Sequence, residues 1–271
     1  DNQPECVART QAVLSLAKAM GSHVTGVAPT EVLDLRANLN LASSVASLPI
    51  LGLDSRLEDA TRAALAFDVA CEIHGVAAHT AIVEETDMRS ALDRRGRVND
   101  LIVLTQSDPR ADNGQAFSNP QIEDVILASA RPVIVLPYAN AASTLGTNVL
   151  VAWDDSHAGA RALADALPLL RRAQSVQVML FNRPAPADEG GLSADLSSVA
   201  EWLGRHGVTA RTHVATTSIA IADALLSRAS DLGSDLIVMG AFGHSRWRER
   251  LLGGTTRMVL GTMTVPVLMS H

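Results

Sequence analysis

The segment LIVMGAFGHSRWRERLLGGTTRM, residues 236–258, sets an apolar run directly before a series of spaced glycines. Its first four residues, 236–239, contain no polar side chain, which is typical of a parallel strand buried on both faces. Gly240 and Gly243 follow this run, and Gly253 and Gly254 precede a helix expected at 255–260. Either the glycines only form a strand-to-helix turn, or they leave room for the phosphates of a ligand.

Predicted strands and helices alternate along the second half of the chain. Apolar runs of strand length predict strands at residues 148–153, 176–181, 208–214, 236–239 and 265–269. The first helix between them is one that Ser156 caps and Pro168 ends or kinks. Further helices are expected at 192–206, 219–232 and 255–260. The alternation predicts a parallel sheet with helices on both faces.

The first half of the chain repeats this pattern. DLIVL at 100–104 matches DLIVM at 235–239, and RPVIVL at 131–136 matches VPVLM at 265–269. A His-Gly-Val sequence lies upstream in both halves, at 74–76 and at 206–208. Landmarks shared in the same order indicate a tandem duplication. We therefore predict an α/β protein with two tandem doubly wound parallel-sheet domains, at residues 1–140 and 147–271, joined by a linker at 140–147.

The two repeats differ at their beginnings. In the second repeat a strand precedes Asp154, whereas the first repeat starts at the matching residue, Asp1. A doubly wound sheet without this strand loses much of its core, so we expect the native protein to have residues before Asp1. The first repeat also carries extra sequence at 31–55, for which we expect a cover or lid.

Composition excludes several classes of protein. A net charge of −7 and a pI near 5.6 disfavour a general nucleic-acid-binding protein, because such proteins carry basic surfaces. No apolar stretch approaches the roughly 20 residues that span a bilayer. Cys6 and Cys71 form no disulfide framework, which is consistent with the cytoplasm. Lys18 is the only lysine, so phosphate in the second repeat would be held by other donors.

The glycines between 240 and 254 fall where parallel α/β sheets bind ligands, beyond the carboxyl ends of their strands. The backbone N–H groups of Gly240 and Gly243 can approach an anion closely. Gly253 and Gly254 stand before a predicted helix, whose N-terminus favours phosphate. The segment is therefore a candidate phosphate site built from backbone donors.

Side chains beside the glycines extend this candidate site. Thr255 and Thr256 add hydroxyl groups. Asp154, at the end of the first strand of the repeat, lies at the same edge and can reach a ribose or a metal ion. Asp154 and Asp155 together are candidates for holding Mg²⁺ beside a nucleotide, and paired acids at a helix start are equally explained by capping.

The spacing Gly240-x2-Gly243-x9-Gly253, between an apolar strand and a final strand that contains proline, resembles the nucleotide-binding signature of the universal stress protein family. VAWDDS at 151–156 is similar to that family's first strand and acidic turn. The resemblance covers the whole second repeat. It implies a Rossmann-like, adenine nucleotide alpha hydrolase-like fold that binds ATP or AMP, with Mg²⁺ as a candidate companion.

The resemblance also implies a role for individual residues. Phosphate is implied to contact Gly240, Gly243, Gly253 and the residues just after Gly253. The ribose is implied to contact Asp154, and the adenine Phe181. The family usually has serine or threonine directly after the last motif glycine, and here that residue is Gly254. Thr255 and Thr256 are the candidates to supply the missing hydroxyl.

The first repeat lacks the glycine pattern. After Leu104 it reads TQSDPRADNGQ, with no Gly-x2-Gly and no glycine pair before the next predicted helix. We predict that this repeat does not bind nucleotide in the same mode and is a partner domain. The resemblance implies that the two repeats pair about a pseudo-twofold axis, as homodimers of single domains do. A homodimer of the whole chain is a further candidate assembly.

Other patterns have simpler explanations. Cys71, His74 and His79 have the residue types of a metal site, but a buried thiol and surface histidines explain them as well. Within HSRWRER, residues 244–250, Arg246 is a candidate for steering phosphate, whereas the other arginines fit a solvated helix face. The His-Ser pair that opens this segment lacks the G-x-S-x-G sequence of a serine hydrolase.

The sequence therefore predicts a cytoplasmic stress-response protein that binds an adenine nucleotide in its second repeat. Its role is expected to be regulatory, with slow or no hydrolysis, because no residue stands out as a general base. The alternative is an interaction or scaffold protein with a vestigial site. An enzyme acting on a nucleotide or a small acid is the least supported hypothesis. No partnership with nucleic acid or membrane is expected.

Overall fold

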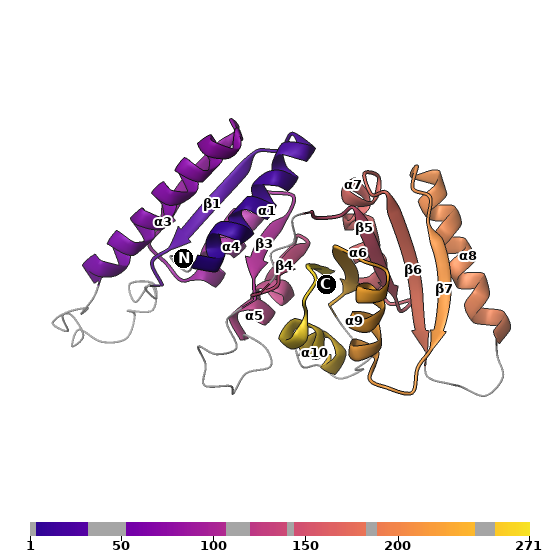
Figure 1. Cartoon of the computed structure of the whole chain (residues 1–271). Helices are drawn as coiled ribbons and strands as arrows, with labels where there is room; N and C mark the ends of the chain where they lie inside the picture. The colour runs from indigo at the N-terminus through magenta and orange to yellow at the C-terminus, as the bar shows by residue number, and fades with distance from the viewer. Residues whose placement is uncertain (1–3, 32–52, 107–119, 140–143, 183–188, 242–252) are drawn as a thin grey trace. The chain divides into compact units, whose positions relative to one another are not determined.

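The computed structural model describes residues 4–31, 53–106, 120–139, 144–182, 189–241 and 253–271 (Figure 1). The chain forms two compact units, Asp1–Val98 and Asn99–His271. Each unit contains parallel strands covered by helices, so the predicted α/β class is confirmed. Among the described helices, none is long and apolar enough to cross a membrane.

The first unit contains a two-stranded parallel sheet. Its elements are α1 (Pro4–Met20), β1 (Val24–Pro29), α3 (Leu53–His74), β2 (His79–Glu84) and α4 (Met88–Gly96). β1 pairs with β2 from Val24–His79 to Pro29–Glu84. Leu14, Cys71 and Val76 form the core, with Phe67 of α3 packed against them. Phe67 lies so close to β1 that a Cβ on Gly26 would collide with its ring.

The second unit contains a seven-stranded sheet in the order β3-β4-β9-β8-β5-β6-β7. Neighbouring strands are parallel except for β4 and β9, which are antiparallel. Its strands are β3 (Ile102–Thr105), β4 (Val133–Leu136), β5 (Asn148–Trp153), β6 (Ser175–Asn182), β7 (Arg211–Thr216), β8 (Leu236–Gly240) and β9 (Val267–Ser270). Its helices are α5 (Pro120–Ala128), α6 (His157–Asp165), α7 (Leu167–Leu170), α8 (Glu189–Arg205), α9 (Ile221–Asp231) and α10 (Gly254–Thr262).

Capping and proline divide the chain after β5 as the sequence indicates. The side chain of Ser156 accepts a hydrogen bond from the Gly159 N–H and caps α6. The helix ends at Asp165, and Pro168 lies in the first turn of the short α7. Proline is tolerated there because the first N–H groups of a helix have no partner within it. The predicted cap and the predicted proline break are both confirmed.

The last strands of the two repeats pair with each other. Ile134 and Leu268, each two residues after the proline that the repeats share, are direct partners in the antiparallel pair of β4 and β9. A pairing of equivalent residues in opposite directions relates these strands by a local pseudo-twofold axis. Arg257 of α10 donates to Glu123 of α5 at 3.2 Å, and these residues also hold equivalent places, nine before the proline.

This pairing divides the chain differently from the predicted domains, 1–140 and 147–271. β3 and β4 belong to the first repeat in sequence, yet they continue the sheet of the second unit. The reason is the hydrogen-bonded contact between β4 and β9, which joins the end of one repeat to the end of the other. The boundary between the compact units therefore lies after Val98.

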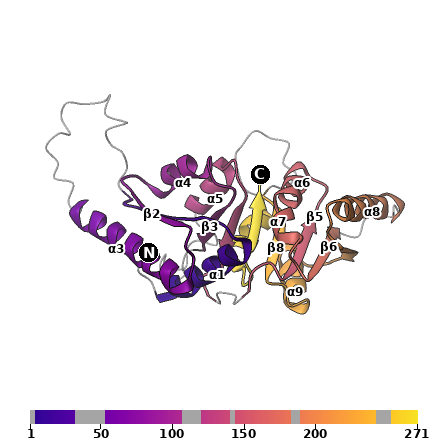
Figure 2. The same ribbon diagram turned by 90° about the horizontal axis from the view of Figure 1, so that it is seen from above.

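The five strands of the second repeat form one continuous sheet, with β5 between β8 and β6 (Figure 2). The described part of the first repeat contributes two separate pairs, β1-β2 and β3-β4, which correspond in order to β6-β7 and β8-β9. Most of the expected lid at 31–55 lies outside the described residues.

Candidate functional site

The carboxyl ends of β5, β6 and β8 meet at one edge of the second unit. Trp153 is in register with Leu180 of β6, and Ala152 is in register with Met239 of β8. The residues that follow these positions, Asp154, Phe181 and Gly240, therefore reach the same edge of the sheet. The structure brings these three predicted contact residues together.

Gly240 is required by packing at this edge. It is buried at the end of β8, and a Cβ there would stand 2.6 Å from the Gly159 nitrogen and 2.8 Å from the Ala158 carbonyl carbon. Both are backbone atoms of the first turn of α6, which cannot move aside without moving the helix. The absence of a side chain at this position thus allows α6 to approach β8, whatever else the residue contacts.

Asp154 forms part of the turn between β5 and α6. Its Oδ1 accepts hydrogen bonds from the Ser156 N–H at 3.1 Å and from the Ser156 hydroxyl at 2.6 Å. Asp155 adopts a positive φ of 57°, which tightens the turn. Both aspartates are exposed. Asp154 thus closes the turn that leads into α6, whereas the cap of this helix is Ser156 and no acidic residue lies in its first turn.

The N-terminus of α10 has no side-chain cap. Gly253 is the N-cap residue, with φ −61° and ψ 153°, and among the described residues no side-chain cap hydrogen bond is made there. Gly254 and Thr255 are exposed, and a Cβ on Gly254 would meet nothing within 4 Å in the described part of the chain. Thr256 is only 2% exposed. The open part of this helix start consists of backbone and Thr255, whereas the Thr256 side chain faces the interior.

Part of the predicted site lies outside the described residues. Gly243 and the segment HSRWRER at 244–250, which includes Arg246, fall in residues 242–252. Phe181 is described and is partly exposed near the end of β6. In the described part of the chain, no group of three or more histidine, cysteine, aspartate or glutamate side chains is placed to hold a metal ion.

Sequence reasoning missed Trp153. Its side chain is 9% exposed, and among the described residues its indole Nε1 has no hydrogen-bond partner. The one sequence signal was its place directly before Asp154, at the end of a central strand. A buried donor without a partner is uncommon in folded proteins.

The first repeat uses the corresponding strand end differently. Thr105 ends β3, five residues after Asp100, as Gly240 ends β8 five residues after Asp235. The next residue, Gln106, donates from Nε2 to the Leu260 carbonyl of α10 at 2.8 Å and accepts from the Tyr138 N–H at 3.0 Å. Its side chain thus helps to join the two repeats.

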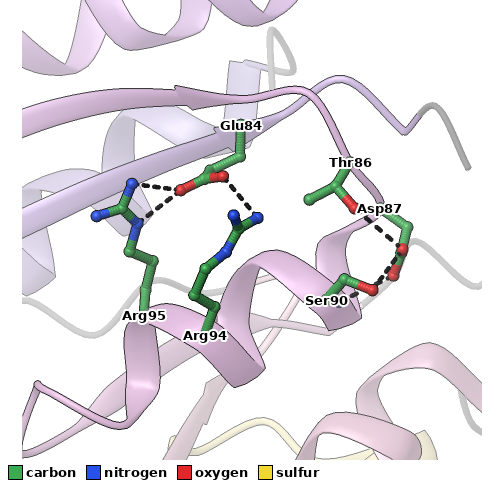
Figure 3. Close-up of polar contacts among 6 residues, drawn as sticks. All are labelled: Glu84, Thr86, Asp87, Ser90, Arg94 and Arg95. Atoms are coloured by element: carbon green, nitrogen blue, oxygen red, sulfur yellow. Dashed lines mark hydrogen bonds and ion pairs between the residues drawn. The ribbon is translucent and has the colours of Figure 1, made fainter. Parts of the chain in front are cut away.

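The carboxyl end of the two-stranded sheet in the first unit is occupied by ion pairs (Figure 3). Glu84, at the end of β2, is 6% exposed and lies between two guanidinium groups of α4. Arg94 donates to its Oε2 at 2.9 Å, and Arg95 donates to its Oε1 at 2.6 Å. Both oxygens of this buried carboxylate are therefore paired within the unit.

The N-terminus of α4 is closed by its own cap. Asp87 accepts a hydrogen bond from the Ser90 N–H at 2.9 Å and one from the Ser90 hydroxyl at 2.7 Å (Figure 3). Burial favours the neutral acid, but the hydrogen bonds from Ser90 and Thr86 outweigh burial and lower the pKa of Asp87 below its ordinary value. Its carboxylate takes the place at this helix start that a bound anion would take.

In the structure, Cys71 and His79 of the Cys71, His74 and His79 pattern have different surroundings. Cys71 is fully buried, and burial raises the pKa of its thiol. His79 contacts the Val76 carbonyl through Nδ1 at 2.7 Å and Asp68 through Nε2 at 2.9 Å. Both ring nitrogens of His79 are therefore engaged, and its role is to join the start of β2 to α3.

Comparison with known families decides the classification of the second repeat. Residues 147–271 match the family model described as Universal stress protein family. The second repeat belongs to this family. The resemblance carried by the glycine spacing and by VAWDDS is thereby confirmed.

Relatives of known sequence and structure agree. A universal stress protein from Synechocystis sp. is 30% identical over 178 residues, which are 62% of this chain and 57% of that protein. The chain thus spans a little over half the length of this curated relative. The crystal structure of a universal stress protein from Archaeoglobus fulgidus has a TM-score of 0.69 at 18% identity, with 100% of this chain and 95% of that chain covered. A functionally unknown protein from Pseudomonas aeruginosa has a TM-score of 0.59 at 15% identity, with coverage of 100% and 89%. These structures support the Rossmann-like fold.

Proposed function

We propose that the second repeat binds an adenine nucleotide, ATP or AMP, at the carboxyl edge formed by β5, β6 and β8, and that the protein acts as a cytoplasmic regulator in a stress response. The observation that carries this proposal is the start of α10. Among the described residues, its first turn has no side-chain cap, and nothing lies within 4 Å of the Cβ position of Gly254. Unpaired N–H groups at a helix N-terminus attract phosphate.

The described residues fit such a ligand. Gly253, Gly254 and Thr255 present backbone donors for phosphate, and no lysine is needed. Asp154 lies beside the end of β5 for the ribose, and the partly exposed Phe181 follows Leu180 at the end of β6 for the adenine. Thr256 belongs to the same helix turn and is only 2% exposed, so Thr255 is the better placed of the two threonines to offer its hydroxyl to a ligand. Gly240 sets the position of α6, and Gly243 is proposed as a phosphate contact from its place in the motif.

Regulation is proposed over strong catalysis because of the state of Asp154. Its carboxylate accepts two hydrogen bonds from Ser156, so it is held in the turn rather than poised to activate water. The exposed carboxylate of Asp155 is the group that would take part in holding Mg²⁺ beside the phosphates.

The alternative is an interaction or scaffold protein with a vestigial site. It is favoured by the structural roles of Gly240 and Asp154, since close packing of α6 and the turn after β5 require these residues without any ligand. The two functions make different demands on Gly254. Nothing in the described structure fills the space beside this residue, so packing does not require a glycine there, whereas a bound phosphate would.

Titration calorimetry of the whole chain with ATP and AMP, with and without Mg²⁺, tests the proposal. We expect binding, and we expect Gly254→Val to weaken it about tenfold or more, which is at least about 1.4 kcal/mol. The added side chain has room in the protein but intrudes on the phosphate position. Gly204→Val is the matched control, because Gly204 is also exposed in a helix with nothing within 4 Å of its Cβ position.

The outcomes separate the two functions. Nucleotide binding that Gly254→Val weakens and Gly204→Val leaves unchanged supports the proposal. No binding of either nucleotide by the wild-type chain favours the scaffold. Binding that is equally strong in wild type and Gly254→Val shows a nucleotide site elsewhere.

A further inference from the structure

The indole of Trp153 is a buried donor at the proposed nucleotide site. Among the described residues, the buried side-chain atoms without a hydrogen-bond partner are Thr30 Oγ1, Trp153 Nε1 and Arg228 Nε. The threonine belongs to the first unit and the arginine to α9. Trp153 is the one at the end of β5, next to Asp154. An unpaired buried N–H destabilises the state that contains it, unless a partner arrives from outside the protein.

The position of Trp153 in the sheet brings it close to the proposed contacts. β5 is hydrogen-bonded on both sides, so the tryptophan lies between β6 and β8. Its direct partner in β6 is Leu180, which precedes Phe181. On the other side, Gly240 is one residue beyond Met239, the partner of Ala152. The backbone of Trp153 is thus flanked at the same level by the strand ends proposed to bind the base and the phosphates.

We infer that Trp153 Nε1–H donates a hydrogen bond to the nucleoside part of the bound adenine nucleotide and so contributes to its selection. This inference rests on the proposed function. The nucleoside is favoured over the phosphates because Trp153 adjoins Asp154 and pairs with the residue before Phe181, whereas the phosphates belong to the start of α10. A base or a ribose offers acceptors that match an indole N–H, which only donates.

Two substitutions test this hydrogen bond. Trp153→Phe keeps an aromatic ring and removes the donor, and replacement of Trp153 by 3-benzothienylalanine keeps the bicyclic shape with sulfur in place of N–H. Trp202→Phe is the control, because Trp202 lies in α8 of the same unit with its ring 4.2 Å from that of His206. Calorimetry with adenosine, AMP and ATP gives the affinity of each variant, and thermal unfolding without ligand gives its stability.

Loss of one hydrogen bond is expected to weaken ligand binding about tenfold. We expect the same factor for adenosine, AMP and ATP in both Trp153 variants, and none in Trp202→Phe. A tryptophan that serves only the fold would shift the unfolding temperature and leave all three affinities unchanged, which would overturn the inference. Weakening confined to AMP and ATP would also overturn it, because the acceptor would then be phosphate.

Failure of the inference differs from failure of the proposed function. If the wild-type chain binds AMP or ATP and the benzothienylalanine variant binds equally well, only the role of Trp153 is wrong. If the wild-type chain binds none of the three ligands, the nucleotide function fails and the inference fails with it. The isosteric variant keeps the test decisive even where Trp153→Phe does not fold.

Discussion

The second repeat holds its five strands in one sheet, whereas the described strands of the first repeat form two pairs in separate sheets. The pairs themselves are alike. β1 and β2 pair in parallel as β6 and β7 do, and β3 and β4 pair in parallel as β8 and β9 do. In each such pair the described part of the connection contains a crossover helix, which makes the pair a local unit of the fold.

The difference lies in β5, the strand that joins the pairs of the second repeat. It is hydrogen-bonded to β6 on one side and to β8 on the other, and its Leu150 is fully buried. The turn after β5 also carries Asp154, and the strand beside it ends at Gly240. The comparison therefore teaches that the continuous sheet and the candidate site depend on the same central strand.

Gly240→Ala should have the largest effect on the second unit. A Cβ there would lie 2.6 Å from the Gly159 nitrogen, and the backbone of α6 cannot yield cheaply. We expect a loss of about 3 kcal/mol in the free energy of unfolding, because overpacking against backbone forces the helix away from the sheet. Urea unfolding of the whole chain, followed at α6 by hydrogen exchange, measures this loss.

Thr105 provides the control in the first repeat, because it ends β3 as Gly240 ends β8. Thr105→Gly should cost only about 1 kcal/mol, the usual effect of glycine within a strand. A Gly240→Ala variant as stable as wild type would show that α6 does not approach β8 as closely as described, and that the glycine serves the ligand alone.

Local features of the fold could be predicted from the sequence. The apolar run 236–239 becomes a fully buried strand, Ser156 caps α6, and Pro168 separates α6 from α7. Each of these depends on residues a few positions apart, whose side-chain period or backbone restriction is visible in the chain. The same holds for the common edge reached by Asp154, Phe181 and Gly240, since parallel strands end together.

Features that depend on distant contacts could not be predicted in this way. The boundary after Val98 follows from the pairing of β4 with β9, which brings Ile134 against Leu268. The burial of Thr256, and the lack of a partner for Trp153 Nε1 among the described residues, depend on how helices pack on the sheet. The spacing of residues along the chain does not reveal that Thr255 is exposed while its neighbour Thr256 is buried.

The pair Glu123–Arg257 tests the pseudo-twofold contact between the repeats. These residues hold equivalent positions in the two repeats. Two repeats of identical sequence would therefore bring like charges together at this contact, whereas here opposite charges meet at 3.2 Å. We expect Glu123→Arg or Arg257→Glu alone to destabilise the second unit by about 1.5 kcal/mol, a value between those of exposed and buried pairs. The double variant should recover most of that loss in a double-mutant cycle measured by urea unfolding. Losses that simply add would show that the two charges do not interact.

Asp87→Ala tests a cap that the first repeat has and the second lacks. Asp87 accepts from Ser90 at the start of α4, whereas Ala220 at the start of α9 makes no such bond. We expect a loss of about 1 kcal/mol near neutral pH, read from hydrogen exchange of the α4 amides. Because the folded pKa of Asp87 is lowered, this stabilisation is present above its ordinary value of 3.8 and is lost as the pH falls below it. A difference in stability between variant and wild type that persists at pH values well below 3.8 would contradict the capping role.

Ala220→Ser should transfer the missing cap to the second repeat, with the smallest effect. Ala220 already has the extended backbone of an N-cap residue, with φ −58° and ψ 139°, and Asp223 stands three residues later. A serine hydroxyl there can accept from the backbone of the first turn, so we expect a gain of about 0.5 kcal/mol in the second unit. Slower hydrogen exchange at the start of α9, with no change at α4, would establish that this difference between the repeats is local. Unchanged exchange at α9 would mean that its first turn is held by packing instead, through the buried Ala222 and Leu225.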